Sequence, residues 1–340
     1  MIKVGIVGLG FMAATHLKAY RHLGGMRIGA LVSPSGARLD GDFSEVAGNI
    51  GTAEPLKLDM SFVKGYRLLA DMLADPEIQM VDICAPTHAH VEIAVAALQA
   101  GKHVLCEKPL ARTSAQAAKI VEAAKGAKGF FMPAMCLRFW PEWAWLKTTI
   151  EAGTFGKVLG ARFRRVCEPP GWGTANYFDG KRSGGALLDL HIHDTDFVQF
   201  CFGRPNGVYS TGYTKFSGAI DHVLTQYQVA GGAMVSAEGS WAMTKGFGFN
   251  MAYTVNFERA TVDYDLARGV EALRIVEEGQ EPRTMKCEGI DGYAEELAYF
   301  RNCIRDGTAP AIVTAADGLS AVQICEAEEE SIKKGTVIAL

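Results

Sequence analysis

Three short stretches of the sequence combine residue types that could carry chemistry: closely spaced glycines, a Glu-Lys pair, and an aspartate four residues before a histidine. They are GIVGLGFMA (5–13), HVLCEKPLA (103–111) and SGGALLDLHIHDTD (183–196). Closely spaced glycines let a backbone approach phosphate groups. A lysine ammonium can stabilise negative charge on an oxygen, and an imidazole can exchange a proton near neutral pH. The stretches therefore suggest a phosphate-bearing cofactor and a reaction in which a proton moves.

The glycine stretch has the context that a dinucleotide-binding loop requires. Its G-x-G-x-x-A pattern follows an apolar strand pattern over 2–7 and opens a helical pattern over 11–23. The first glycine permits a tight turn, the second lets the backbone approach a pyrophosphate, and the small third residue lets the helix pack on the sheet. N–H groups in the first turn of the helix would face the phosphates. The predicted cofactor residues are Gly8, Gly10, Phe11 and Met12, with Ala13 as the small third residue.

The end of the second predicted strand bears on which nicotinamide nucleotide binds. In a dinucleotide fold, an Asp or Glu about 20 residues after the glycines holds the adenosine ribose hydroxyls. Here the strand is followed by SPSGAR, which has no carboxylate at that place. Ser33, Ser35 and Arg38 could instead bind a 2′-phosphate through charge-assisted hydrogen bonds, which favours NADP over NAD. The alternative is that these are ordinary turn residues and that Asp40 or Asp42 returns to bind the ribose.

The first 125 or so residues alternate between strand and helix patterns. Strands are expected at 2–7, 27–32, 80–85 and 103–106, and helices at 11–23, 87–101 and 113–124. Thr87 occupies the N-cap position of the second helix, and Thr113 or Ser114 that of the third. Such alternation implies a parallel sheet with right-handed crossovers. The sequence therefore predicts an α/β Rossmann domain, with a doubly wound parallel sheet, over residues 1–128.

The pattern changes after about residue 130. Strand patterns occur at 157–167, 207–216, 222–229, 233–241 and 250–257, and a helical pattern at 315–334. The segment Ala230-Gly231-Gly232 between two of the strands predicts a hairpin turn. Runs of strands joined by short turns predict an α+β domain over 129–340, with a large, mostly antiparallel open sheet. A length of 340 residues suits two domains.

Bulk composition argues against several classes of partner. A net charge of -4 gives no electrostatic reason to expect nucleic acid or an anionic membrane. The eight cysteines never form C-x-x-C, which indicates reduced thiols rather than disulfides or a zinc site. Neither a signal peptide nor an apolar stretch long enough to span a bilayer is expected. These features predict a cytoplasmic protein.

A fourth motif, DICAPTHAH (82–90), lies between the glycine stretch and the Glu-Lys pair. Together, in order and spacing, the four motifs resemble the Gfo/Idh/MocA family, the glucose-fructose oxidoreductase and inositol dehydrogenase group. The resemblance spans nearly the whole chain. It implies an NAD(P)-dependent oxidoreductase that transfers a hydride between the nicotinamide and a hydroxyl or carbonyl carbon of a sugar, polyol or related compound. A homodimer or homotetramer is also implied. Two alternatives stay open: an NAD-dependent glycosidase that uses transient oxidation, and a non-catalytic nucleotide-binding regulator.

The resemblance also implies roles for individual residues. Glu107 would hold the nicotinamide ribose, and Lys108 would lie beside the nicotinamide and polarise the substrate oxygen. His193 would act as general acid or base, and Asp189 would orient its ring or contact the substrate. A helix over 183–196 would place these two side chains on one face.

A strand over the same segment would give a different site. Residues 189, 191 and 193 would then face one side and could be mistaken for metal ligands. The preceding glycines and the apolar spacing favour the helix, so no metal is expected. Further candidates are, for the nicotinamide ribose, Pro86, Thr87 and His90, and, for the substrate, Arg138 and Trp172.

Overall fold

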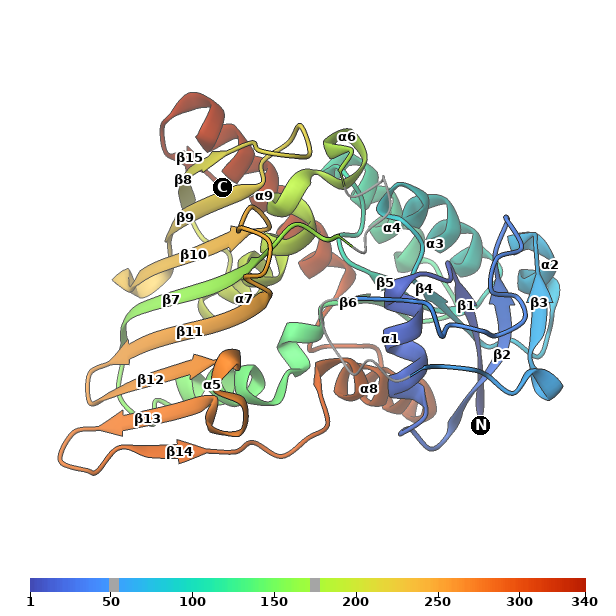
Figure 1. Cartoon of the computed structure of the whole chain (residues 1–340), viewed down its shortest axis with the longest axis horizontal. Helices are drawn as coiled ribbons and strands as arrows, with labels where there is room; N and C mark the ends of the chain where they lie inside the picture. Colours follow the sequence, from blue (N-terminus) through green and yellow to red (C-terminus); the bar gives the residue numbers. More distant parts are fainter. Residues whose placement is uncertain (49–54, 172–177) are drawn as a thin grey trace. The chain divides into compact units, whose positions relative to one another are not determined.

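The computed structural model describes residues 1–48, 55–171 and 178–340, and the chain forms two compact units (Figure 1). The first unit contains Met1–Cys136 and Asp291–Leu319, and the second contains Leu137–Ile290 and Ser320–Leu340. The first unit thus extends beyond the expected boundary at residue 128 and also takes in a late segment. That segment belongs there because its helix α8 (Gly292–Asp306) packs against α1 (Phe11–Tyr20).

The first unit is built on a six-stranded sheet with the order β3-β2-β1-β4-β5-β6. All of its pairings are parallel. The strands are β1 (Ile2–Val7), β2 (Met26–Val32), β3 (Lys64–Tyr66), β4 (Met80–Ile83), β5 (His103–Glu107) and β6 (Phe131–Ala134). This order is that of a doubly wound dinucleotide-binding sheet. The predicted α/β Rossmann fold is therefore confirmed.

Four helices connect strands of this sheet. They are α1, α2 (Leu69–Ala74), α3 (His90–Gln99) and α4 (Ser114–Lys125). The Thr113 hydroxyl accepts a hydrogen bond from Gln116 N, so the predicted cap of α4 is confirmed. The prediction that Thr87 caps a helix was wrong. A short 3₁₀ turn, Thr87–Ala89, precedes α3, and the N-cap residue of α3 is Ala89.

The second unit contains a nine-stranded sheet with the order β14-β13-β12-β11-β7-β10-β9-β8-β15. The strands in chain order are β7 (Val158–Cys167), β8 (Gly207–Tyr213), β9 (His222–Gln228), β10 (Met234–Ser240), β11 (Phe249–Phe257), β12 (Ala260–Asp265), β13 (Leu273–Glu277), β14 (Arg283–Met285) and β15 (Ile338–Ala339). Only β7 and β10 pair in parallel among these described strands. The mostly antiparallel sheet and the β9–β10 hairpin confirm the predictions, whereas β12 to β15 were not predicted.

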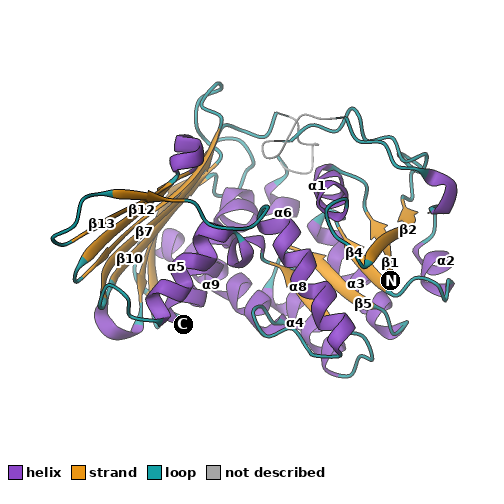
Figure 2. Cartoon of the chain, turned by 90° about the horizontal axis from the view of Figure 1, so that it is seen from below, coloured by secondary structure: helices purple, strands orange, loops and turns teal. Residues whose placement is uncertain are grey.

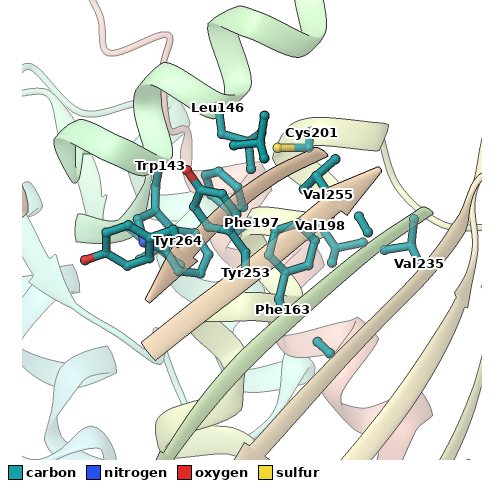
Figure 3. Close-up of a cluster of buried hydrophobic side chains, with 14 of the residues drawn as sticks. Trp143, Leu146, Phe163, Phe197, Val198, Cys201, Val235, Tyr253, Val255 and Tyr264 are labelled. Atoms are coloured by element: carbon teal, nitrogen blue, oxygen red, sulfur yellow. The ribbon is translucent and has the colours of Figure 1, made fainter. Parts of the chain in front are cut away.

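One face of the nine-stranded sheet is covered by helices (Figure 2). They are α5 (Pro141–Glu151), α7 (Ile192–Phe202) and the greater part of α9 (Ala315–Lys334), whereas the short α6 (Gly180–Ser183) lies against the loop between β8 and β9. Trp143 of α5 is fully buried at the centre of this layer (Figure 3). Its ring meets Phe197 and Tyr253 edge-on, with centroid separations of 4.9 and 5.1 Å. This aromatic packing fixes α7, the helix that follows Asp189.

Candidate functional site

The turn after β1 requires glycine at position 8. Gly8 has a φ of +87°, and a Cβ there would lie 2.5 Å from the backbone N and Cα of Ala85. Its N–H donates to the Val32 carbonyl at 3.2 Å. The turn is therefore held between the ends of β2 and β4, at the carboxyl edge of the sheet.

Gly10 is required for a different reason. It is the N-cap residue of α1, and no side chain caps the helix there. A Cβ on Gly10 would meet no described protein atom within 4 Å, so a side chain would take up space in front of the helix N-terminus. Phe11 and Met12 form the first helical turn, as predicted. A glycine at a helix N-terminus fits a nucleotide pyrophosphate, which needs N–H donors and close backbone approach.

The residues predicted to bind a 2′-phosphate follow β2. Ser33 is buried, and its hydroxyl lies 3.2 Å from that of Ser35. Arg38 donates from Nη1 to the Leu9 carbonyl at 3.1 Å, so its guanidinium lies against the glycine loop. The alternative ligand Asp42 forms an ion pair with Lys57 at 2.8 Å, and that partner holds the pKa of the carboxyl well below its usual range.

The Glu-Lys pair stands at the same edge of the sheet. Glu107 is the last residue of β5, and one of its carboxylate oxygens accepts the Lys108 N–H at 3.1 Å. The Lys108 side chain is half-buried, directly beyond the strand, as expected for a residue at the carboxyl edge. Pro109 does not start a helix, because α4 begins only at Ser114.

His90 connects two loops of this edge. Its ring nitrogens lie 2.9 Å from the Pro109 carbonyl and 2.7 Å from the Ala85 carbonyl. Burial lowers the pKa of His90, and a neutral ring can donate to only one of these oxygens. The ring is thus engaged with backbone, while Pro86 is exposed and Thr87 half-buried in the same loop. Contact of these three residues with a ribose stays a prediction.

In the second unit, the segment with the D-x-x-x-H pair is helical, as expected, but it is not a regular α-helix. Leu187–His191 forms one π turn that continues into α7. A π turn contains an extra residue, and such turns are frequent at functional sites. From 187 to 199, only Asp189, Leu190 and His193 are not buried. The two predicted catalytic side chains are therefore the polar groups that this segment presents.

The π turn is anchored from behind by His191. Its Nε2 lies 3.1 Å from the Tyr227 hydroxyl, which donates to Glu328 at 2.7 Å. His191 also packs closely against Gly239 of β10. A Cβ added to Gly239 would lie only 2.5 Å from the Cβ of His191. No sequence pattern pointed to Tyr227, Gly239 or Glu328, because they are far from the π turn along the chain.

The predicted substrate residue Arg138 lies inside the second unit. Its guanidinium makes two hydrogen bonds to the Asp196 carboxylate, at 2.8 and 2.7 Å, and stacks over the Phe200 ring at 4.6 Å. These contacts give Arg138 a structural role, and its contact with a substrate stays a prediction. Trp172, the other predicted substrate residue, lies outside the described residues. Lys108 belongs to the first unit and Asp189 and His193 to the second, so their joint action in one site also stays a prediction.

Comparison with known proteins agrees with this geometry. Residues 2–135 match the model of an oxidoreductase family with an NAD-binding Rossmann fold, and residues 143–263 match the GFO/IDH/MocA C-terminal domain. The chain belongs to the Gfo/Idh/MocA family. The resemblance noted from the four motifs is thereby confirmed.

Relatives of this Gfo/Idh/MocA protein include several dehydrogenases. A myo-inositol 2-dehydrogenase of Thermotoga maritima is 24% identical, over 100% of this chain and 98% of its own. A levoglucosan dehydrogenase of Pseudarthrobacter phenanthrenivorans is 32% identical over 62% of this chain and 54% of its own. A solved levoglucosan dehydrogenase in complex with NADH and levoglucosan has a TM-score of 0.85 at 24% identity, covering 99% of each chain. This last likeness shows that the fold is shared.

The two glycines predict separable defects. Gly10→Ala should leave the unfolding free energy within about 0.5 kcal/mol of wild type, because its φ of -97° suits alanine, yet weaken nucleotide binding about tenfold. Gly8→Ala should cost at least about 2 kcal/mol of stability, because it adds a side chain at positive φ against backbone. Denaturant unfolding and nucleotide titration of both variants would measure this.

The variants Gly8→Ala and Gly10→Ala serve as controls for each other, since both substitutions add one methyl group to the same loop. A Gly10→Ala variant that binds nucleotide as tightly as wild type would contradict the assignment of the helix N-terminus to the pyrophosphate.

Proposed function

We propose that this protein transfers a hydride between a nicotinamide nucleotide and a hydroxyl or carbonyl carbon of a sugar, polyol or related compound. The observation that carries the proposal is the position of Lys108. It follows β5 at the sheet edge where the Gly8 turn leaves β1. In doubly wound sheets, ligands bind at the carboxyl ends of the strands.

Each residue has a defined task in the proposed reaction. The bound nucleotide supplies the hydride acceptor or donor. Lys108 hydrogen-bonds the substrate oxygen and stabilises its developing negative charge. His193 takes or returns the hydroxyl proton, and Asp189 orients its ring or binds the substrate. Glu107 holds the nicotinamide ribose.

Two observations support a sugar or polyol as substrate. Relatives that match this chain are named for inositol and levoglucosan, which are polyhydroxylated compounds. The partly exposed polar groups of the π turn, Asp189 and His193, are a hydrogen-bond acceptor and a proton-exchanging group. Both suit a substrate that presents several hydroxyls.

We further propose that the nucleotide is NADP(H) rather than NAD(H). Ser33, Ser35 and Arg38 offer two hydroxyls and a guanidinium after β2, and Asp42 is engaged with Lys57. The matched family model is described as NAD-binding, and the levoglucosan dehydrogenase structure contains NADH. The proposal that a nicotinamide nucleotide binds therefore holds for NAD(H) as well as for NADP(H).

We also propose that the protein works in a reducing compartment such as the cytoplasm. None of the eight cysteines, all of which lie in the described residues, forms a disulfide, and seven of them are buried. Cysteines without disulfides in this number are typical of reducing surroundings. Separately, no helix among the described residues is long and apolar enough to cross a membrane.

Replacing Lys108 tests the proposed reaction. Lys108→Ala should bind nucleotide within a few-fold of wild type but lose at least about 100-fold in turnover, because a charge-stabilising donor is removed. Nicotinamide fluorescence titration and a rate assay against a panel of sugars and polyols would measure the two effects. Lys119→Ala, an exposed position on α4, is the matched control. Full turnover by Lys108→Ala would refute the assigned role.

Replacing Arg38 tests the choice of nucleotide. Arg38→Ala should weaken NADPH binding about tenfold and leave NADH binding nearly unchanged, because only NADPH carries a 2′-phosphate. The measurement is a side-by-side titration, with Arg27→Ala, an exposed residue earlier on β2, as control. Equal losses for both nucleotides would count against a 2′-phosphate site.

The open face of the nine-stranded sheet is proposed to join subunits into a dimer or tetramer. It exposes large apolar side chains at Tyr209, Tyr213, Leu224, Met234 and Val276. The mass in solution, measured by light scattering, should be two or four times 36.6 kDa. A Leu224→Arg and Met234→Arg double variant should dissociate, since charges would be buried unpaired. A wild-type monomer at micromolar concentration would refute this proposal.

A further inference from the structure

Behind Glu107 lies a set of buried ionisable side chains, which we call the His16 cluster. Four elements contribute its members: α1, the end of β4 with the residue after it, β5 and α8. They are His16, Tyr20, Asp82, Cys84, Glu107 and Glu296. None is more than 9% exposed, and His16, Asp82 and Glu296 are fully buried. Charges in such a place must be balanced within the cluster, because water does not screen them.

The imidazole of His16 lies between two carboxylates. Its Nδ1 is 2.9 Å from Asp82 Oδ2, which also accepts the Tyr20 hydroxyl at 3.0 Å. Its Nε2 is 3.1 Å from Glu107 Oε1, an ion-pair contact rather than a well-aligned hydrogen bond. A neutral ring would turn a lone pair toward one of the carboxylates, whereas an imidazolium presents a proton to each.

The surroundings favour that charged form. Burial alone would lower the pKa of His16, but the Asp82 carboxylate and the Cys84 sulfur raise it well above its usual value of 6.5. Burial raises the pKa of Glu296 well above its usual value, and Glu107 and Asp82 raise it further, although His16, whose Nε2 lies 4.0 Å away, lowers it. Burial likewise raises the pKa of Cys84, Cys106 and Tyr20, which stay protonated.

Glu107 is thereby held at both oxygens. Oε1 faces the His16 ring, and Oε2 accepts the Lys108 N–H. We propose that His16 is a positioning residue: as an imidazolium it fixes the orientation of the Glu107 carboxylate for the nucleotide. This inference rests on the proposed role of Glu107 at the nicotinamide ribose.

A metal ion is the other occupant that this chemistry would allow. His16, Glu107 and Glu296 have ligand atoms within 4.8 Å of one another. A neutral ring that donates from Nδ1 to Asp82 would leave a lone pair on Nε2 for such an ion, whereas an imidazolium would not. The protonation state of the ring therefore distinguishes the two occupants.

The first test reads the His16 ring directly, in the whole chain without nucleotide. NMR spectra of imidazole-¹⁵N histidine at about pH 8 should show both nitrogens of His16 protonated, because a raised pKa preserves the cation until the pH rises through it. The signal is assigned as the one absent from His16→Asn. A neutral ring would overturn the proposal, as would a ring bound to a metal ion detected by elemental analysis.

The second test is a double-mutant cycle on nucleotide binding. His16→Asn and Glu107→Gln should each weaken binding about tenfold, and the double variant should be no more than about twofold weaker than Glu107→Gln, since His16 acts through Glu107. Asparagine can still donate to Asp82 but is too short to reach Glu107. His22→Asn, exposed just after α1, is the matched control. Additive losses, about 100-fold in the double variant, would overturn the proposal.

The two tests also distinguish a wrong role for Glu107 from a wrong charge state of His16. Normal binding by Glu107→Gln would remove Glu107 from the nucleotide site, whatever the charge of His16. The NMR result involves no nucleotide and therefore tests the imidazolium by itself.

Discussion

The parallel pairing of β1 with β2 and β4, and of β4 with β5, determines where chemistry can occur in the first unit. Parallel strands all end at the same edge, so everything that follows them is brought together there. Gly8 presses against Ala85, and His90 reaches from the loop after β4 to the carbonyl of Pro109. These contacts make the loops at the edge one connected surface. A shift of register in any strand would separate them.

Buried polar pairs have the corresponding role in the second unit. Three consecutive residues of α7 are fully buried, and each has a partner from another element: Asp194 with Arg165 at 2.8 Å, Thr195 with Glu328 at 3.1 Å, and Asp196 with Arg138. Burial raises the pKa of Asp194 even beside Arg165. Breaking a buried ion pair, such as either of the two Asp–Arg pairs, costs about 3–5 kcal/mol, so other rotations of the helix are strongly disfavoured. The rotation of α7 that satisfies all three buried pairs leaves the side chains of Asp189 and His193 partly exposed.

The sequence was informative where the cause of structure is local. Glycines after an apolar strand, a threonine at a helix start and alternating polar and apolar residues predicted Gly8, the cap of α4 and most strands of both sheets. It could not predict features that depend on distant partners. The π turn has no local pattern, since it is held by Tyr227 and Glu328. The pairing of Arg138 with Asp196 turned a candidate substrate residue into part of the interior. His16 gave no signal in the sequence, because its partners Asp82, Glu107 and Glu296 come from three other elements.

Because α8 belongs to the first unit but lies late in the chain, the first unit can be completed only late in synthesis. During synthesis the residues up to Cys136 emerge first, yet they lack the helix that packs on α1 and buries the His16 cluster. Strands β7 to β14 of the second sheet are made before that helix appears. The nucleotide-binding unit therefore cannot finish folding on the ribosome as an early, independent module, and until α8 emerges its charged interior stays open to water.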